Sequence, residues 1–209
     1  DISVACVAIN EITDKLSLDE KWPFRKLGDI SSLSRGASPR PIEKFITDRE
    51  DGVPWIKIGD VAPGDKFIRK TAEKITPEGA SKSRRVYAGD FIISNSMSVG
   101  RPYIVDIDGC VHDGWLIVSG VSKDVNKDYL FCILSGENAQ SQFQNRALGG
   151  VVKNLNIDRA KSVSIPVPPL SVQQQIVARI ETQHQIIAAA KTLIAAAPAR
   201  KDAILRQYL

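Results

Sequence analysis

The stretch that decides the fold is PVPPLSVQQQIVARIETQHQIIAAAKTLIAAAPARKDAILRQYL, residues 166–209. Pro169, the last of three prolines at its start, excludes a helix before it, because proline lacks a backbone N–H and disfavours the helical conformation in the preceding residue. From Ser171, a suitable N-cap, to Ala197 there is neither proline nor glycine. We therefore expect one helix between these two residues, about 40 Å long at 1.5 Å per residue.

One face of this helix carries apolar or small residues with a single polar exception. Their alternating steps of four and three residues are the spacing of the a and d positions of a coiled coil. Either this face packs on the domain of the same chain, or it pairs with a second helix from another repeat or another chain. The length of the helix favours pairing. The predicted partner-helix interface consists of Ile176, Ile180, Gln183, Ile187, Ala190 and Ile194.

A further proline, Pro198, lies near the end of the sequence. Pro198 is expected to break the long helix, because a proline in a helix interior removes a hydrogen bond and clashes with the preceding turn. Residues 199–209 are then expected to form a last short helix.

Composition limits the class of protein. Of 209 residues, 43% are hydrophobic and 25% are charged, which are globular values and fit one domain with an appendage. No apolar run reaches the length of a membrane span. The three cysteines are odd in number and widely spaced, which favours reduced thiols over a disulfide framework or a zinc site. We expect a cytoplasmic protein.

Charge is distributed unevenly along the chain. The formal net charge is +4, and the sequence pI is about 9.0. Residues 25–85 contain 14 Lys or Arg and 9 Asp or Glu, so their balance is 14 − 9 = +5, whereas residues 90–130 have 3 − 6 = −3. The first region could therefore face an anionic partner such as a phosphate backbone.

The body of the chain indicates an α+β fold with many short strands. Thr76 and Pro77 predict a helix start, as N-cap and first helical residue. The dipeptide Asp108–Gly109 predicts a hairpin turn between strands over 101–111. Further strands are expected within 53–61, 66–70, 91–93 and 114–119, a helix over 128–144, and a short helix followed by a strand over 156–167.

Motifs for catalysis are not found. The segment GDVAPGDK, residues 59–66, resembles a phosphate-binding loop, but Asp65 stands where the motif needs lysine and would repel phosphate. Neither a dinucleotide-binding G-x-G-x-x-G nor a G-x-S-x-G nucleophile elbow occurs. His112 could be a ligand or a base, but a loop histidine bonded to a neighbouring carboxylate or to backbone is the favoured interpretation. We expect no catalysis by this chain and no metal site.

Four segments together resemble the specificity (S) subunit of type I restriction-modification enzymes. The G-D-I, G-x-S-P-R and P-P-L-x-x-Q-x-x-I elements within them are weak singly and specific in combination. The segments are WPFRKLGDISSLSRGASPRP (22–41), GVPWIKIGDV (52–61), YAGDFIISNSMSVGRPYIVDIDGCVHDGW (87–115) and LGGVVKNLNIDRAKSVSIPVPPLSVQQQIVARIE (148–181).

The resemblance implies one half of such a subunit. In that family, two target-recognition domains are each followed by a long helix, the two helices pair antiparallel, and methyltransferase subunits dock around them. Residues 22–169 would be one recognition domain and 170–209 one spacer helix. Residues 1–21 would be a leader or the end of a preceding domain.

The resemblance also implies the partners. They are double-stranded DNA, a methyltransferase subunit and, through the helix, a second copy of the chain or a second half subunit. No cofactor is expected on this chain, since S-adenosylmethionine, ATP and Mg would belong to partner subunits. An alternative is that the chain is the C-terminal specificity region of a fused restriction-methyltransferase enzyme.

Candidate DNA contacts follow from the chemistry of DNA recognition. Cationic side chains neutralise phosphates, whereas lysine and short polar side chains recognise base edges. For phosphate contact we select Arg40, Lys82, Arg84, Arg85 and Lys153. For base-edge contact we select Lys57, Ser94, Asn95 and Ser96.

Overall fold

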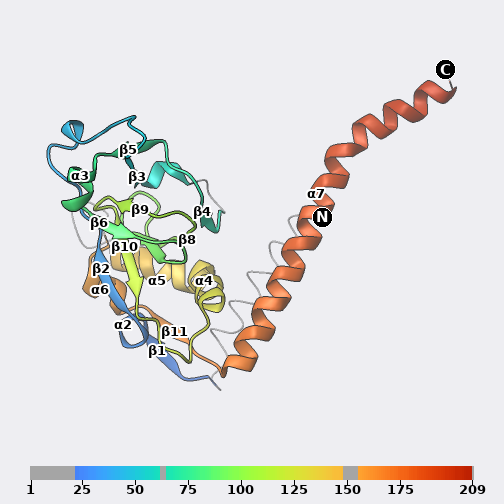
Figure 1. The fold of residues 1–209 in the computed structure, drawn as a ribbon. Helices are drawn as coiled ribbons and strands as arrows, with labels where there is room; N and C mark the ends of the chain where they lie inside the picture. Colours follow the sequence, from blue (N-terminus) through green and yellow to red (C-terminus); the bar gives the residue numbers. More distant parts are fainter. Residues whose placement is uncertain (1–21, 62–64, 148–154, 209) are drawn as a thin grey trace.

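The computed structural model describes residues 22–61, 65–147 and 155–208 of the chain. It shows an α+β domain from which one long helix, α7, extends (Figure 1). The expected fold class is therefore confirmed. The ends of the domain are tied together because its first strand, β1, pairs with its last, β11.

The strands of the described residues form three sheets. The five-stranded sheet has the order β2-β10-β7-β8-β4, the four-stranded sheet has the order β5-β3-β9-β6, and β1 pairs only with β11. Neighbours are antiparallel except β3 with β9 and β4 with β8. The bounds are β1 Phe24–Lys26, β2 Ser32–Arg35, β3 Val53–Ile56, β4 Phe67–Ile68, β5 Glu73–Ile75, β6 Arg84–Val86, β7 Phe91–Ser94, β8 Pro102–Val105, β9 Gly109–Val111, β10 Trp115–Ser119 and β11 Ser164–Pro166.

The helices lie mainly on one side of the five-stranded sheet. In Figure 1, α4 and α5 lie beside β8 and β10, and α3 lies at the opposite end of the domain. The bounds are α2 Leu27–Ile30, α3 Pro77–Ser81, α4 Lys127–Ser135, α5 Glu137–Ala147, α6 Ile157–Lys161 and α7 Leu170–Tyr208, with short 3-10 turns η1 Ile42–Lys44 and η2 Ile58–Asp60.

The five-stranded sheet is buried on both faces. Along β7, Phe91 and Ile93 join the core that packs on the helices, whereas Ile92 joins the core between the two larger sheets. Trp115 of β10 also lies between the sheets, and its indole N–H donates to the carbonyl of Ile56 in β3 at 3.1 Å. A third core, which includes Trp55 and Ile75, fills the outer face of the four-stranded sheet.

The segment 53–61 contains the expected strand, but the strand fills only its first four residues. The strand ends at Ile56 and is followed by η2. Trp55 and Ile56 are both buried, because β3 lies inside the four-stranded sheet with a core on each face.

The predicted hairpin at Asp108–Gly109 is also wrong. Its two strands exist, but β8 belongs to the five-stranded sheet and β9 to the four-stranded sheet. Asp108 accepts a hydrogen bond from the backbone of Ala88 at 3.0 Å, so it stabilises a crossing between sheets. The local Asp-Gly signal identifies a turn but not the strand with which each arm pairs.

Two helix predictions have different outcomes. Thr76 accepts a hydrogen bond from Gly79 N, and Pro77 is the first residue of α3, as expected. The single helix predicted over 128–144 is two helices, because the chain is extended at Gly136, between α4 and α5.

The long helix begins and ends differently from the prediction. The carbonyl of Pro169 accepts from Val172 and Gln173, so the helix begins at Leu170 and Ser171 is not its N-cap. Pro198 lies inside α7 and does not break it. A proline removes one hydrogen bond of the ladder, and the neighbouring turns can continue past that gap with a bend.

Candidate nucleic-acid interface

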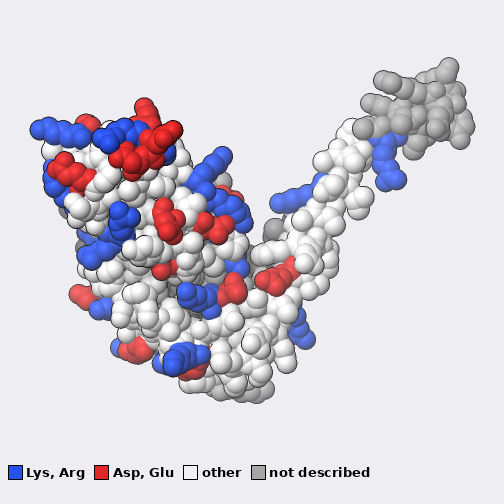
Figure 2. Space-filling view, viewed as in Figure 1, with Lys and Arg blue, Asp and Glu red and all other residues white. Residues whose placement is uncertain are grey.

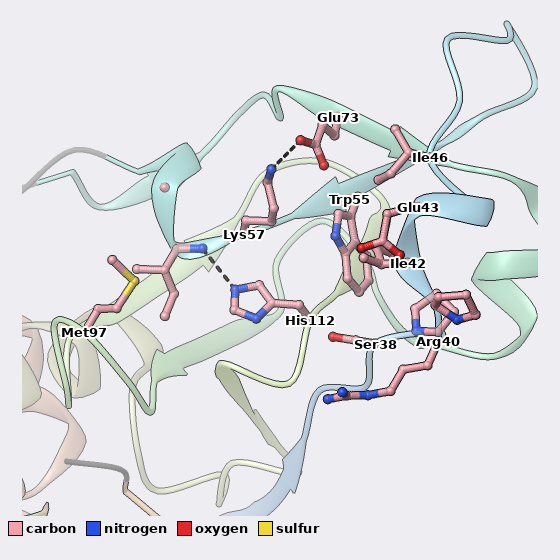
Figure 3. A pocket seen from close by; sticks show the side chains of 14 residues that line it. Ser38, Arg40, Ile42, Glu43, Ile46, Trp55, Lys57, Glu73, Met97 and His112 are labelled. Atoms are coloured by element: carbon pink, nitrogen blue, oxygen red, sulfur yellow. Dashed lines mark hydrogen bonds and ion pairs between the residues drawn. The ribbon is translucent and has the colours of Figure 1, made fainter. Parts of the chain in front are cut away.

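An open pocket of about 1060 Å³ lies at the end of the domain built from β3, η1 and the loop before it. Figure 3 shows charged side chains around an apolar floor of Trp55 and Ile42. It is lined by Ser38, Pro39, Arg40, Pro41, Ile42, Glu43, Ile46, Trp55, Lys57, Ile58, Gly59, Glu73, Met97 and His112.

Two of the predicted DNA-contact residues, Lys57 and Arg40, meet at this pocket. Lys57 follows β3, and its ammonium lies 2.7 Å from the carboxylate of Glu73 in β5. Both side chains are partly exposed, at 36% and 39%. The pair therefore remains accessible to a ligand.

Arg40 is the more exposed of the two cations. Its side chain is 81% exposed and lies 3.7 Å from Asp113. The hydroxyl of Ser38 donates to Asp113 at 2.7 Å, and this bond is the main reason that the pKa of the Asp113 carboxyl lies below its usual value. Arg40 therefore projects beside a carboxylate that stays ionised, with most of its guanidinium free to meet an anion.

His112 forms the back of the pocket. The backbone N–H groups of Ile58 and Gly114 point at its two ring nitrogens, at 3.1 and 2.8 Å. A neutral ring accepts from one of these two N–H groups and a protonated ring from neither, and burial lowers the pKa of His112. The loop histidine is thus structural, bonded to backbone, as the favoured interpretation of the sequence had it.

Three further predicted phosphate contacts come from the end of α3 and from the strand β6 that follows it. Arg84 and Arg85 are exposed on the edge strand β6. Lys82 lies over the ring of Phe45 and pairs with Glu78 at 2.7 Å. Lys153 lies outside the described residues. Figure 2 shows blue and red side chains interspersed on the face of the domain in view, so the positive balance of residues 25–85 does not form one continuous basic surface on that face.

The loop predicted to contact base edges is largely inside the protein. Ser94 and Asn95 are fully buried. Ser94 donates to the carbonyl of Ser98, and Asn95 donates to the carbonyl of Asp113 at 2.9 Å. Both side chains donate to backbone carbonyls inside the protein and are not available to DNA, so their selection as base contacts is corrected. Ser96 is half-buried.

The most exposed residue of this loop is Met97. Its side chain is 86% exposed and lines the pocket, and its φ of 57° lies in the left-handed region, which is unusual for a residue other than glycine. Neither Met97 nor Glu73 belongs to a motif that marks it in the sequence. An alternating-strand pattern could have placed Glu73 beside Lys57 only if the pairing of β3 with β5 had been known.

The predicted helix interface divides into two parts. Ile176 and Ile180 belong to the core of the domain, so their assignment to a partner helix is corrected. Ile187 is also buried, Gln183 and Ala190 are half-buried, and Ile194 is exposed. Two further large apolar side chains on this part of α7, Ile186 and Leu193, are exposed as well.

A buried glutamine fixes α7 to the domain. Gln173 is fully buried, accepts from the backbone N–H of Asn126 at 2.8 Å, and donates to the carbonyls of Asp124 and Pro168 at 2.8 and 2.7 Å. It thereby joins the first turn of α7 to the N-terminus of α4. Together with Ile176 and Ile180, it sets the direction in which the helix leaves the domain.

The comparisons with known proteins agree with this architecture. The family model described as "Type I restriction modification DNA specificity domain" matches residues 19–198. The chain belongs to this family.

Two further kinds of site are absent from the described residues. No group of acidic, histidine or cysteine side chains there could hold a metal ion, and none of the helices has the length and apolar character of a membrane span.

Individual relatives show how much of a known protein the chain matches. It is 25% identical over 182 residues to the type I restriction enzyme EcoBI specificity subunit of Escherichia coli, covering 81% of this chain and 38% of that protein. The crystal structure of the HsdS subunit from Thermoanaerobacter tengcongensis matches with a TM-score of 0.70 and 20% identity, over 91% of this chain and 46% of that one. The chain therefore spans less than half the length of either specificity subunit.

The same fold also occurs in the type IIG restriction endonuclease BpuSI, with a TM-score of 0.58 and 13% identity over 83% of this chain and 28% of that one. That match covers less of both chains than the HsdS match does. The family model and the Escherichia coli relative are both of the type I specificity class, so the fused-enzyme alternative is not favoured.

Proposed function

We propose that this chain binds a short sequence of duplex DNA and, through α7, holds that domain at a set distance from a second DNA-binding domain. The observation that carries the proposal is the family match over residues 19–198. The placement of Arg40 and Lys57 at one open pocket supports it from the geometry.

Affinity for DNA would come from the exposed cations. Arg40, Arg84 and Arg85 are exposed, and Lys82 is about half exposed, so all four can reach phosphates without unfolding any element. Each neutralised phosphate releases a counterion and makes binding weaker as salt is raised. Four such contacts correspond to a slope of about −4 in a plot of log binding constant against log salt.

Chemistry on the DNA would be done by a partner. We infer that methyl transfer belongs to a methyltransferase subunit, which would bring S-adenosylmethionine, and that any ATP and Mg belong to restriction subunits. The scaffold for that partner would be α7 and the adjoining domain surface.

The second DNA-binding domain would come from a second copy of the chain or from a second half subunit. The exposed Ile186, Leu193 and Ile194 support helix pairing along the outer part of α7. Pairing would be shorter than the whole seam, because Ile176 and Ile180 are occupied by the domain of the same chain.

The test measures binding of the purified chain to labelled random-sequence duplexes by fluorescence anisotropy, from about 50 to 200 mM salt. A steep loss of affinity with salt and no methyl transfer from S-adenosylmethionine without a partner are expected. Methylation of DNA by the chain alone would contradict the proposed division of labour. Failure to bind any duplex at low salt would contradict DNA binding.

A further inference from the structure

Lys57 and Glu73 present a hydrogen-bond donor and an acceptor side by side at the pocket. Their charged atoms are 2.7 Å apart, and both side chains are partly exposed. In Figure 3 the pair lies at the pocket, with Trp55 and His112 nearby.

The backbone that carries the pair is held by one carboxylate. Asp60 accepts from the N–H of Lys57 at 2.7 Å and from the N–H of Ala72, next to Glu73, at 2.9 Å. Glu73 is also fixed in register, opposite Trp55 of β3. Groups that are already in position lose less conformational entropy when a ligand binds.

The Lys57–Glu73 pair contributes little to folding stability or to the general electrostatic attraction of DNA. Exposed ion pairs contribute little to stability, because water screens them. Its two charges cancel, so it adds little to the salt-dependent attraction of phosphates. A neutral donor and acceptor couple is suited to recognising base edges, which carry the sequence information.

We propose that Lys57 and Glu73 together recognise one G·C base pair in the major groove. Lys57 donates to O6 and N7 of guanine, and Glu73 accepts from the N4 amino group of the paired cytosine. Guanine O6 and cytosine N4 are hydrogen-bonded to each other, so they lie about 3 Å apart. The 2.7 Å between the lysine nitrogen and the glutamate oxygen matches that spacing.

An A·T pair fits the couple less well. Glu73 could accept from adenine N6, but its carboxylate would then lie beside the acceptor N7. Lys57 could donate to thymine O4, but it would meet the methyl group where guanine offers a second acceptor. This inference rests on the proposed function, and it assigns two residues and one base pair to the proposed DNA recognition.

The experiment is selection of bound duplexes from a random-sequence library by the full chain, followed by sequencing. Lys57→Met removes the ammonium and keeps an unbranched stem of four atoms, and Glu73→Gln removes the charge and keeps side-chain length. Lys74→Met is the matched control, since Lys74 follows Glu73 in β5 and does not line the pocket. Thermal melting establishes that each variant is folded.

The wild-type motif is expected to contain one required G·C pair. Both pocket variants should relax the preference at that pair by about tenfold and leave the other positions unchanged. Lys74→Met should keep the full motif. A swapped pair, Lys57→Glu with Glu73→Lys, keeps the ion pair and should exchange G and C between the strands at that position.

These outcomes distinguish failure of the Lys57–Glu73 assignment from failure of the proposed DNA-binding function. If both pocket variants recover the wild-type motif unchanged, the assignment of the pair is overturned while DNA specificity stands. If the wild type enriches no motif, the proposed function fails and this inference fails with it. If a single variant does not fold, the swapped pair decides, and an unaltered motif there overturns the assignment.

Discussion

His112 makes the stability of the pocket depend on pH. Burial is the main cause that holds its pKa below the usual value, and both ring nitrogens face backbone N–H groups. Below about pH 6.5 the unfolded chain therefore binds more protons than the folded chain, and the free energy of unfolding falls as pH falls. This contribution is absent above that pH, where both states hold the ring neutral.

We predict that His112→Gln weakens this dependence. Urea unfolding of the wild type and the variant, at about pH 7.5 and about pH 5.5, measures it. The wild type should lose more free energy of unfolding between the two values than the variant does. Equal losses would show that His112 titrates normally in the folded protein.

Arg85 allows the phosphate contacts to be tested one at a time. It is exposed on β6, and its alanine variant is expected to weaken binding to all duplex sequences alike and to reduce the salt slope by about 1. Anisotropy titrations at several salt concentrations measure the slope. A variant with changed sequence preference and an unchanged slope would show a base contact instead.

At the scale of single residues, the sequence does not show which polar side chains are buried. Ser94 and Asn95 have the chemistry to contact bases, but the chain uses them to bond its own backbone at Ser98 and Asp113. Composition alone does not distinguish these two uses. Lys57 and Arg40 do line the pocket, as long cationic side chains that are rarely buried without a partner, and their contact with DNA stays a prediction.

At the scale of elements, the two parts of the α7 seam should respond differently to mutation. Ile180 is buried in the domain core, so Ile180→Ala should cost about 2–5 kcal/mol of stability. Ile194 is 58% exposed, so Ile194→Ala should change stability by no more than about 0.5 kcal/mol.

Denaturant unfolding of both variants measures the contrast. Analytical ultracentrifugation adds a second measurement, since Ile194→Ala should weaken association of the chain if the exposed seam pairs. Similar stability of the two variants would contradict the division of the helix into a docked part and a projecting part.

Gln173 is expected to matter as much as an apolar core residue. Its replacement by alanine leaves the N–H of Asn126 and the carbonyls of Asp124 and Pro168 without this partner, at about 2–4 kcal/mol of stability. Gln173→Glu is the control, because it keeps the acceptor and loses both donors. Denaturant unfolding should therefore rank the wild type above both variants, and unchanged stability in both would contradict this role.

Elements with a purely local signal were predicted well. Thr76 and Pro77 begin α3 because a cap and a fixed φ act within one turn. The hairpin at Asp108–Gly109 failed because strand pairing depends on distant partners, here β6 and β3 for β9. The start of α7 was missed by two residues, because an N-cap at Ser171 would make Val172 the first helical residue, whereas the carbonyl of Pro169 supplies the first acceptor and the helix begins at Leu170.

At the scale of the molecule, the periodicity of α7 predicted a seam but not which surface covers each part of it. The 4–3 spacing predicted a seam along one face of the helix, but a seam does not show what covers it. The first two isoleucines cover the domain's own core, and Gln173 holds that attachment. The projecting remainder, with Leu193 and Ile194 exposed, is the part suited to a second helix.

The most direct measurement of the central claim is the affinity of the chain for its selected duplex against a scrambled duplex at about 150 mM salt. A domain that recognises several base pairs should bind the selected duplex at least about 100-fold more tightly, since each mismatched pair costs about 1–3 kcal/mol. Equal affinity for the two duplexes would show that the chain attracts DNA without recognising its sequence, and would contradict the account.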